Sequence, residues 1–265
     1  MPTLDVLTWP PDPRIARLAE RLGRERAEVP ASVLHEWVSH AWSGYRDARV
    51  QAFVPILVER EVRARIGSAV DADGDPSPGL SLRAWAWLTA RRLLAGELPR
   101  RWAHSRGVAR RAEQIAPAFS PADQELLVAS AWLHDIGYAA PVRDTGMHQL
   151  DGARYLARHG VPDRVCALVA HHAGAAAVAD LVGLAGPLAA FDDERTAVRD
   201  ALWYCDMTTG PDGTSMTFAE RMAELRRRRT ADDPVVRALA VNEEERAAAV
   251  RRTEEHLRAA LARAS

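Results

Sequence analysis

One stretch decides the fold: residues 132–138 read Trp132-Leu133-His134-Asp135-Ile136-Gly137-Tyr138. Further His and Asp residues stand on both sides of it, in the order H…HD…H…H…D, and each lies on an apolar segment with the pattern of a helix or a helix end. The members of this array are His104, His134, Asp135, His148, the pair His171-His172, and Asp206. We therefore predict an all-α chain whose helices bring imidazole and carboxylate side chains together.

This array has the composition of a metal site, because imidazole and carboxylate together suit Zn, Fe, Mn and other divalent metals. Five of the nine histidines belong to it. A lone His on an apolar helix is more often a hydrogen-bonded core residue, but that explanation would have to hold several times over. Asp135 and Asp206 would then also be buried carboxylates without partners, which is costly. The sequence predicts a metal site.

The ordered set resembles the HD-domain superfamily of metal-dependent phosphohydrolases, in particular its branch with two metal ions. The resemblance covers roughly residues 82–230. It implies an HD-domain helical bundle and a phosphatase or phosphodiesterase that acts on a nucleotide or a related phosphoester. The residues that carry it are the doublet His134-Asp135, His148 opening a helix, the pair His171-His172 closing one, and the late Asp206.

The resemblance also implies a role for each ligand in a site with two divalent ions about 3.5–4 Å apart and an activated hydroxide between them. Asp135 would be the bridge, one ion would take His104, His134 and Asp206, and the other would take His148 and His171. Fe or Mn is the expected metal, and Zn, Ni and Co stay open. Mg is less expected because it prefers oxygen ligands.

Two more residues are candidate catalytic residues. Neighbouring helix residues point about 100° apart, so only one of His171 and His172 is expected to bind a given metal. We assign that role to His171 and leave His172 as a substrate contact, a ligand of a third ion or a cap of the helix end. Arg143 lies in the loop between His134 and His148 and is a candidate phosphate clamp, with a solvated loop arginine as the equal alternative.

The ligand set leaves other functions open. Some members of the superfamily use the same ligands in a di-iron oxygenase, which is the second hypothesis. A non-enzymatic, ligand-sensing dimeric regulator is the third, and the complete ligand set argues against it. The pair His171-His172 is followed by Ala173-Gly174-Ala175 instead of the GYP sequence of cyclic-dinucleotide hydrolases, so cyclic di-GMP is a less expected substrate.

Composition limits the remaining choices. The net charge is -1, which favours neither nucleic acid nor membrane as a partner. The chain has no Lys, so any phosphate clamp must be Arg, His, a helix N-terminus or the metal. We expect Cys166 and Cys205 to be buried free thiols, no signal peptide, no apolar run near the roughly 20 residues that span a bilayer, and a cytoplasmic location.

The N-terminal part has a different character. Residues 1–12 are Pro-rich, and residues 14–67 show three short amphipathic patterns that end near Gly23, Gly44 and Gly67. The stretch Ala48-Arg49-Val50-Gln51-Ala52-Phe53-Val54-Pro55-Ile56-Leu57-Val58-Glu59-Arg60 resembles a three-helix dimerisation module found in some actinobacterial proteins. The resemblance implies a homodimer through residues 1–67; packing of this segment on its own catalytic domain is the alternative.

We place a linker at the acidic, Gly/Pro-rich residues 68–81 and a second domain at residues 82–265. Charged residues near its C-terminal end, including the basic run Arg226–Arg229, are interpreted as solvated helix surface. The helices predicted in this domain span residues 83–95, 99–116, 121–134, 147–159, 162–173, 194–208, 217–229 and 242–263.

Overall fold

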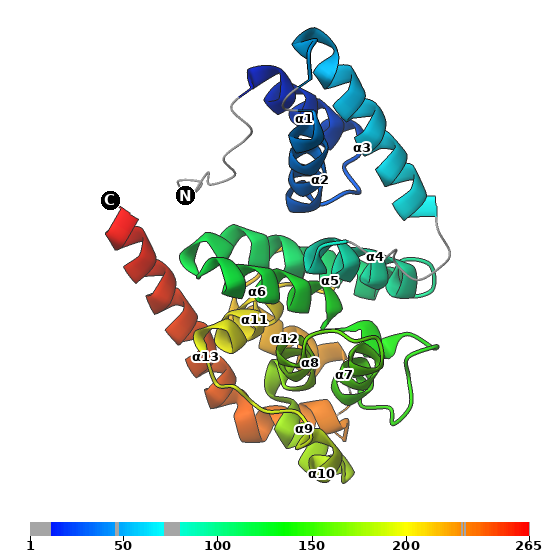
Figure 1. Cartoon of the computed structure of the whole chain (residues 1–265). Helices are drawn as coiled ribbons and strands as arrows, with labels where there is room; N and C mark the ends of the chain where they lie inside the picture. The colour runs from blue at the N-terminus through cyan, green and yellow to red at the C-terminus, as the bar shows by residue number, and fades with distance from the viewer. Residues whose placement is uncertain (1–11, 46–47, 72–79, 229, 231, 265) are drawn as a thin grey trace. The chain divides into compact units, whose positions relative to one another are not determined.

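The structure is a computed structural model that describes residues 12–45, 48–71, 80–228, 230 and 232–264. Every named element in these residues is an α-helix or a 3-10 helix, which confirms the all-α prediction (Figure 1). Backbone contacts divide the chain into two units, residues 1–88 and 89–265, and the division lies inside α4 (Leu82–Leu94). Residues 1–11 of the Pro-rich segment and residues 72–79 of the expected linker lie outside the described residues.

The first unit contains the three predicted N-terminal helices. They are α1 (Pro13–Glu25), α2 (Ala31–Gly44) and, after the 3-10 turn Gln51–Phe53, α3 (Val54–Asp71). Asp12 caps α1 by accepting a hydrogen bond from Arg14 N at 2.9 Å. Pro55 lies in the first turn of α3, where its missing N–H costs no helix bond. The helix continues to Asp71, so the first residues of the expected linker are helical.

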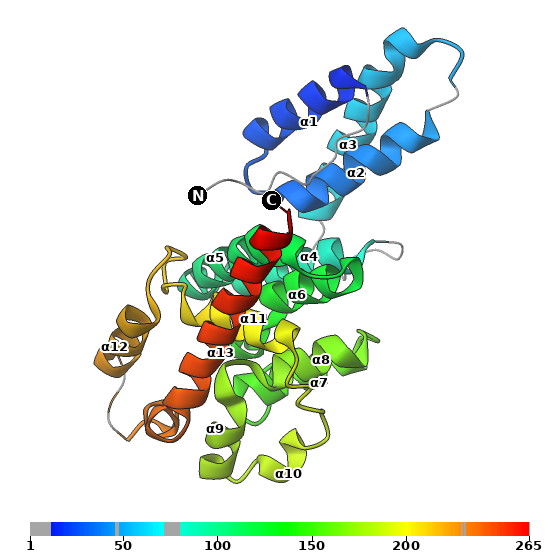
Figure 2. The ribbon, with the colours of Figure 1, turned by 90° about the vertical axis from the view of Figure 1, so that its left-hand side faces the viewer.

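The second unit is built around α11 (Ala197–Met207), which packs against α13 (Pro234–Ala264), α6 (Pro121–Leu133) and α5 (Pro99–Ile115). Figures 1 and 2 both show α13 running alongside α11. The other helices of this unit are α7 (His148–Arg158), α8 (Asp163–Ala170), α9 (Ala175–Val182), α10 (Ala185–Leu188) and α12 (Phe218–Arg228).

Local sequence explains most of these helix ends. Ser120 accepts a hydrogen bond from Asp123 N at 3.3 Å and Pro121 takes the first helical position, as expected for the start of α6. The predicted helix 162–173 ends earlier, at Ala170, and α9 and α10 follow where no helix was predicted. The last helix starts at Pro234 instead of residue 242, and Asn242 is a kink inside it (φ -124°, ψ 15°).

One segment corrects the expectation about apolar runs. Asp163–Val182 is 20 residues long and apolar enough to cross a membrane by length and composition alone. However, 67% of its most apolar window is buried inside the protein, as is common for core helices of soluble proteins. The segment is also not one regular helix, because Ala173 adopts a left-handed conformation (φ 51°) between α8 and α9. Cys166 and Cys205 are buried free thiols, as expected.

Candidate metal centre

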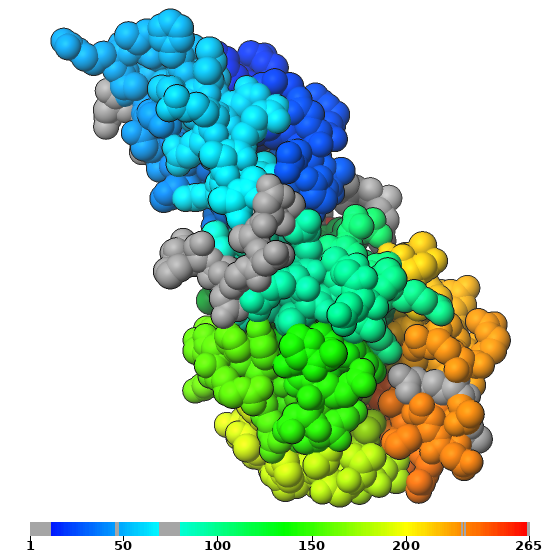
Figure 3. Space-filling view, turned by 90° about the vertical axis from the view of Figure 1, so that its right-hand side faces the viewer, coloured from blue at the N-terminus to red at the C-terminus, as the bar shows by residue number. Residues whose placement is uncertain are grey.

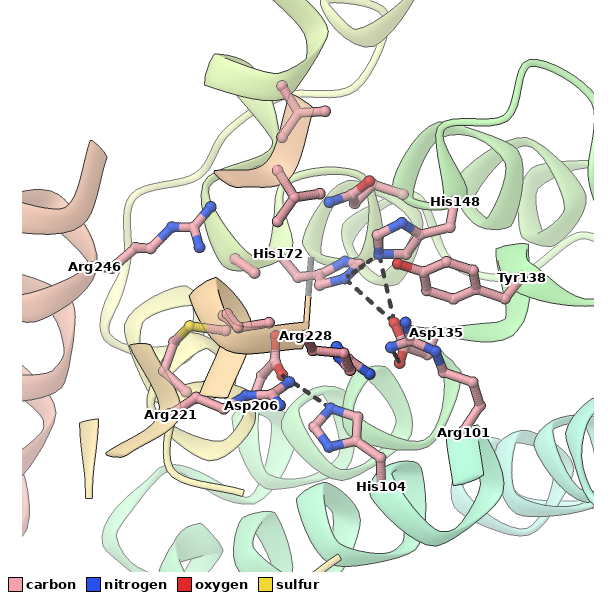
Figure 4. A pocket seen from close by; sticks show the side chains of 16 residues that line it. Arg101, His104, Asp135, Tyr138, His148, His172, Asp206, Arg221, Arg228 and Arg246 are labelled. Carbon is pink, nitrogen blue, oxygen red and sulfur yellow. Dashed lines mark hydrogen bonds and ion pairs between the residues drawn. The ribbon is translucent and has the colours of Figure 1, made fainter. Parts of the chain in front are cut away.

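Asp135 lies two residues after the end of α6 and turns its two carboxylate oxygens toward two groups of histidines (Figure 4). Its Oδ2 lies 3.6 Å from His134 Nε2, and these two residues form one group of potential ligands with His104. Its Oδ1 lies 3.4 Å from His148 Nε2 and 4.0 Å from His172 Nε2, which form the second group. A carboxylate shared by two ligand groups has the placement of a bridging ligand.

Three of these histidines are held in the same way. In each, Nδ1 lies within hydrogen-bond distance of a backbone carbonyl, which can only accept, so Nδ1 carries the proton and Nε2 presents its lone pair. Metal-binding histidines are typically oriented by such a bond from the other ring nitrogen. The distances are 3.0 Å for His104–Gly210, 2.8 Å for His134–Ala131 and 2.6 Å for His172–Val169.

The Nε2 atoms oriented in this way lack suitable partners among the described residues. His134 Nε2 is buried and has no hydrogen-bond partner. His104 Nε2 faces Asp206 Oδ1 at 3.0 Å, which places a lone pair against a carboxylate oxygen. His148 Nε2 and His172 Nε2 lie 3.2 Å apart. Each of these contacts becomes favourable when a cation accepts the lone pairs, so the residues fit divalent transition metals.

Burial and charge keep these groups in the protonation states that metal binding needs. Burial lowers the pKa of His148 well below its usual value and lowers the pKa of His172 to about 4, so both rings are neutral at pH 7. Burial opposes ionisation of Asp135, but the Arg101 guanidinium and the nearby histidines hold its pKa well below the usual range. Burial also opposes ionisation of Asp206, but His104, His134 and Arg221 together lower its pKa below the usual value.

The ligands on α6 and α7 are brought together by a close backbone approach. A Cβ atom on Gly137 would lie 1.9 Å from the carbonyl oxygen of His148, so only glycine allows the start of α7 to sit against the turn that follows Asp135. Asp151 secures the loop before His148 by accepting backbone N–H bonds from Asp144 at 3.0 Å and Thr145 at 2.9 Å.

A second close approach fixes His104. A Cβ atom on Gly107 would lie 2.5 Å from the carbonyl oxygen of Gly213, which brings the turn after α11 onto α5. Gly210 in that turn supplies the carbonyl that orients the His104 ring. The turn formed by Gly210-Pro211-Asp212-Gly213 therefore holds the His104 ring in place.

The structure corrects the choice between the paired histidines. His171 Nε2 bonds with the carbonyl oxygen of Phe191 at 2.7 Å and lies outside both ligand groups. His172, which was left with an open role, takes the place expected for His171. The reason is local: the α8 helix ends at Ala170, and the chain turns through His172 to the left-handed Ala173. A continuous helix through this pair was assumed from sequence, and the break changes which ring faces Asp135.

The structure does not support the expected role of Arg143 as a phosphate clamp. It is exposed, donates to the carbonyl oxygen of Tyr138 at 3.2 Å, and does not line the pocket over the ligands.

Four other arginines line the pocket over the ligands: Arg101, Arg221, Arg228 and Arg246. The pocket has an empty volume of about 450 Å³, part of it open to solvent. On the face in Figure 3, orange atoms of the C-terminal part that includes α12 lie to the right of the green atoms of the part that includes α5 and α7.

Arg101 and Arg221 connect this basic lining to the ligands. Arg101 donates to Asp135 Oδ2 at 2.9 Å and lies over the Tyr138 ring, 3.8 Å from its centroid. Arg221 lies 3.6 Å from Asp206 Oδ1. The sequence offered a signal for Arg101, which stands three residues before His104 and so shares its helix face. Arg221 has no such signal, because α12 meets the site only through tertiary packing.

Comparison with known proteins agrees with this geometry. A family model described as the HD domain matches residues 101–204. The chain contains an HD domain. The match includes both ligand groups around Asp135, and Asp206 lies just beyond its end. HD domains belong to a superfamily made up mostly of metal-dependent hydrolases. No curated protein and no solved structure matches the chain.

Proposed function

We propose that this HD-domain protein is a phosphohydrolase that cleaves a nucleotide or a related phosphoester at a centre of two transition-metal ions. One observation carries the proposal: arginines line the pocket directly over the ligand groups. Guanidinium groups match the geometry and charge of phosphate oxygens. A pocket of this kind favours an anionic substrate, whereas the ligands alone would suit an oxygenase equally.

The side chains divide the chemical work. His104, His134 and His172 present fixed Nε2 lone pairs, so little reorganisation is needed when ions bind. Arg101 holds the Asp135 carboxylate in its shared position and adds positive charge beside it. When bound, two ions would activate water as the nucleophile and offset charge on the phosphoryl oxygens. The imidazole-rich set supports Fe or Mn, with Zn, Ni and Co as further candidates.

Arg221 and Arg228 belong to the same basic wall of the pocket as Arg101. Arg221 donates to Glu224 at 2.8 Å, and Arg228 lies 3.2 Å from the same carboxylate. Glu224 thus holds two guanidinium groups beside the pocket without itself lining it. This arrangement supports binding of a phosphoester, because the cations stay in place before the substrate arrives.

The decisive assay is phosphate release by the Mn-loaded, full-length chain without oxygen, across nucleotides and model phosphoesters. The proposal expects turnover that depends on divalent metal and not on O2. An absence of turnover on every ester, together with substrate-dependent O2 uptake by the iron-loaded chain, would overturn it and establish the oxygenase. Asp135→Asn is the matched control, since it keeps the size of the side chain but removes the charge shared by the two groups.

We also propose that the first unit pairs two copies of the chain. Three large apolar side chains near the start of α3 are exposed: Val50 by 55%, Phe53 by 60% and Ile56 by 62%. Exposed apolar clusters mark interaction surfaces in many proteins. Ile66 of the same helix is fully buried in the unit and does not contribute to this exposed cluster. Phe53→Asp should halve the mass measured by light scattering, with Glu61→Gln as the control; an unchanged mass would contradict the proposal.

A further inference from the structure

Arg246 is a buried cation, and the charges of Asp206 and Glu243 act on it without forming an ion pair. Its relative exposure is 2%, and its Nε has no hydrogen-bond partner. Among the residues that the structure describes, no carboxylate forms an ion pair with it. The two other buried arginines that the structure describes instead have carboxylate partners: Arg199 donates to Asp193 at 2.9 Å and to Glu245 at 2.9 Å, and Arg221 donates to Glu224 at 2.8 Å. Arg246 therefore differs from a structural arginine in its surroundings.

An unpaired buried charge destabilises a fold strongly unless another charge compensates it. Burial lowers the pKa of Arg246 to about 10, so the side chain still carries its proton at neutral pH. Sites where a fold tolerates such a cost are commonly functional ones. The missing partner is an anion, and the planar guanidinium group is suited to two oxygens of one phosphate.

The kink in α13 places Arg246 at the pocket. Asn242 leaves helical geometry and donates from Nδ2 to the carbonyl oxygen of Gly174 at 2.8 Å. Arg246 follows four residues later and so lies on the same face of α13. If Gly174 carried a Cβ atom, the Nε atom of Arg246 would lie 3.1 Å from it. Gly174 is the last residue of the 3-10 turn that begins at His172. The segment that presents a ligand to Asp135 thus also contacts Arg246.

Arg246 reaches into the pocket on the opposite side from Arg101 and Asp135 (Figure 4). Apolar residues that include Val178, Met207 and Val235 line the pocket as well. Because apolar walls exclude water, a charge pair formed here would be stronger than one at the surface. An anion bound by Arg246 would occupy a different part of the pocket from a group placed beside Asp135.

We propose that Arg246 forms a second anion subsite, so that the substrate carries another phosphoryl group besides the one that reacts beside Asp135. This inference rests on the proposed function for its substrate class. Nucleoside diphosphates and nucleosides with two separate phosphates both satisfy it, and a plain monophosphate does not. Arg246 is a specificity-determining residue that contacts the group which is not transferred.

The first test measures the thermal stability of the metal-loaded chain after anions have been dialysed away. Arg246→Met replaces the buried charge with an apolar side chain of similar length and should leave Tm equal or raise it. Arg237→Met, at an exposed position of the same helix, is the control. A fall in Tm of more than about 5 °C for Arg246→Met alone would overturn the proposal, because it would reveal a structural role.

The second test uses binding and turnover. Pyrophosphate should bind Arg246→Met at least about tenfold more weakly than the unchanged chain, while inorganic phosphate binds both equally. The ratio of kcat/KM for a nucleoside diphosphate or bisphosphate to that for the monophosphate should fall by a similar factor. Arg246→Lys should recover part of the loss in both measurements.

These readouts separate the two proposals. Pyrophosphate binding that depends on Arg246 without turnover of any ester would keep the subsite and reject the phosphohydrolase function. Equal pyrophosphate binding by the unchanged chain and Arg246→Met would reject the subsite, whatever the turnover.

Discussion

The first unit (residues 1–88) and the second unit (residues 89–265, called the HD unit below) differ in how their arginines are paired. In the first unit Arg21 and Arg63 donate to Glu59 at 2.7 Å and 2.9 Å, and all these side chains are partly exposed. In the second, Arg101 and Asp135 form an ion pair in which the carboxylate is only 4% exposed. Arg246 is buried, and it forms no ion pair with the residues that the structure describes. Exposed pairs contribute little to stability, whereas buried charges need a specific compensating interaction.

Exposed apolar side chains are distributed differently in the two units, although both units bury a core. In the first unit, Val50, Phe53 and Ile56 lie within seven residues of one another in the sequence. The exposed ones described in the second unit are far apart in the sequence: Val182, Val241 and Leu261. Neither ligand group lies in the first unit. The difference is consistent with the two proposals made above, in which the first unit contributes a contact surface and the second contributes chemistry. Substitutions in the two units should therefore have effects of very different size.

The largest effect is expected at Asp135. Asp135→Ala removes the carboxylate that both ligand groups share, so both ions should be lost and activity should fall on the order of 10³-fold or more. His148→Ala should release mainly one ion, because His148 belongs to a single group. Elemental analysis of the two variants beside the unchanged chain measures this. Full metal content in Asp135→Ala would show that Asp135 is not the bridge.

The next largest effect is expected for Gly137→Ala. The added methyl group would collide with the carbonyl oxygen of His148 and push α7 away from Asp135. We expect a loss of about 2–3 kcal/mol in the free energy of unfolding, with weaker metal binding. Gly186→Ala is the matched control, since nothing lies within 4 Å of its Cβ position. Urea denaturation compares the two, and equal stability would contradict the close approach described for the site.

Arg101→Ala should lower kcat/KM by about 2 kcal/mol, which is close to a thirtyfold effect. The reason is the lost charge-assisted bond to Asp135. Arg143→Ala should change kcat/KM less than twofold, because Arg143 does not line the pocket. Steady-state kinetics on the best phosphoester separates the two arginines. A larger effect at Arg143 would restore it as the phosphate clamp.

The smallest effect belongs to the first unit. Arg63→Ala breaks ion pairs with Glu25 and Glu59 at the surface, so the free energy of unfolding should change by less than about 1 kcal/mol. Salt should reduce even this difference, because exposed pairs are screened. Thermal denaturation at low and high salt provides the measurement. A loss comparable to that of Gly137→Ala would remove the contrast between the two units.

Sequence alone predicted the features that depend on local pattern. The apolar periodicity located α6, and the order of His and Asp residues indicated the HD domain that the family model matches. The doublet His134-Asp135 was readable because it directly follows one apolar helix. Locating the helix needs only residues within a few turns of one another, whereas the array was readable from the order of its members along the chain.

The features that were missed depend on breaks and on distant packing. The left-handed Ala173 rotates His172 toward Asp135 in place of His171, and the pattern of residues gave no sign of that break. Arg246 lies among Glu and Arg residues that were interpreted as a solvated face. Its burial follows from the packing of α13 on η4 (His172–Gly174) and α9, which no local pattern reveals.

The most direct test of the account is the metal content of three chains purified without oxygen and loaded with Mn. The unchanged chain and His171→Ala should each hold about two ions per chain, because His171 lies outside both ligand groups. His172→Ala should hold about one, since it loses a ligand from the group formed with Asp135 and His148. Loss of an ion from His171→Ala with full content in His172→Ala would contradict the site described here.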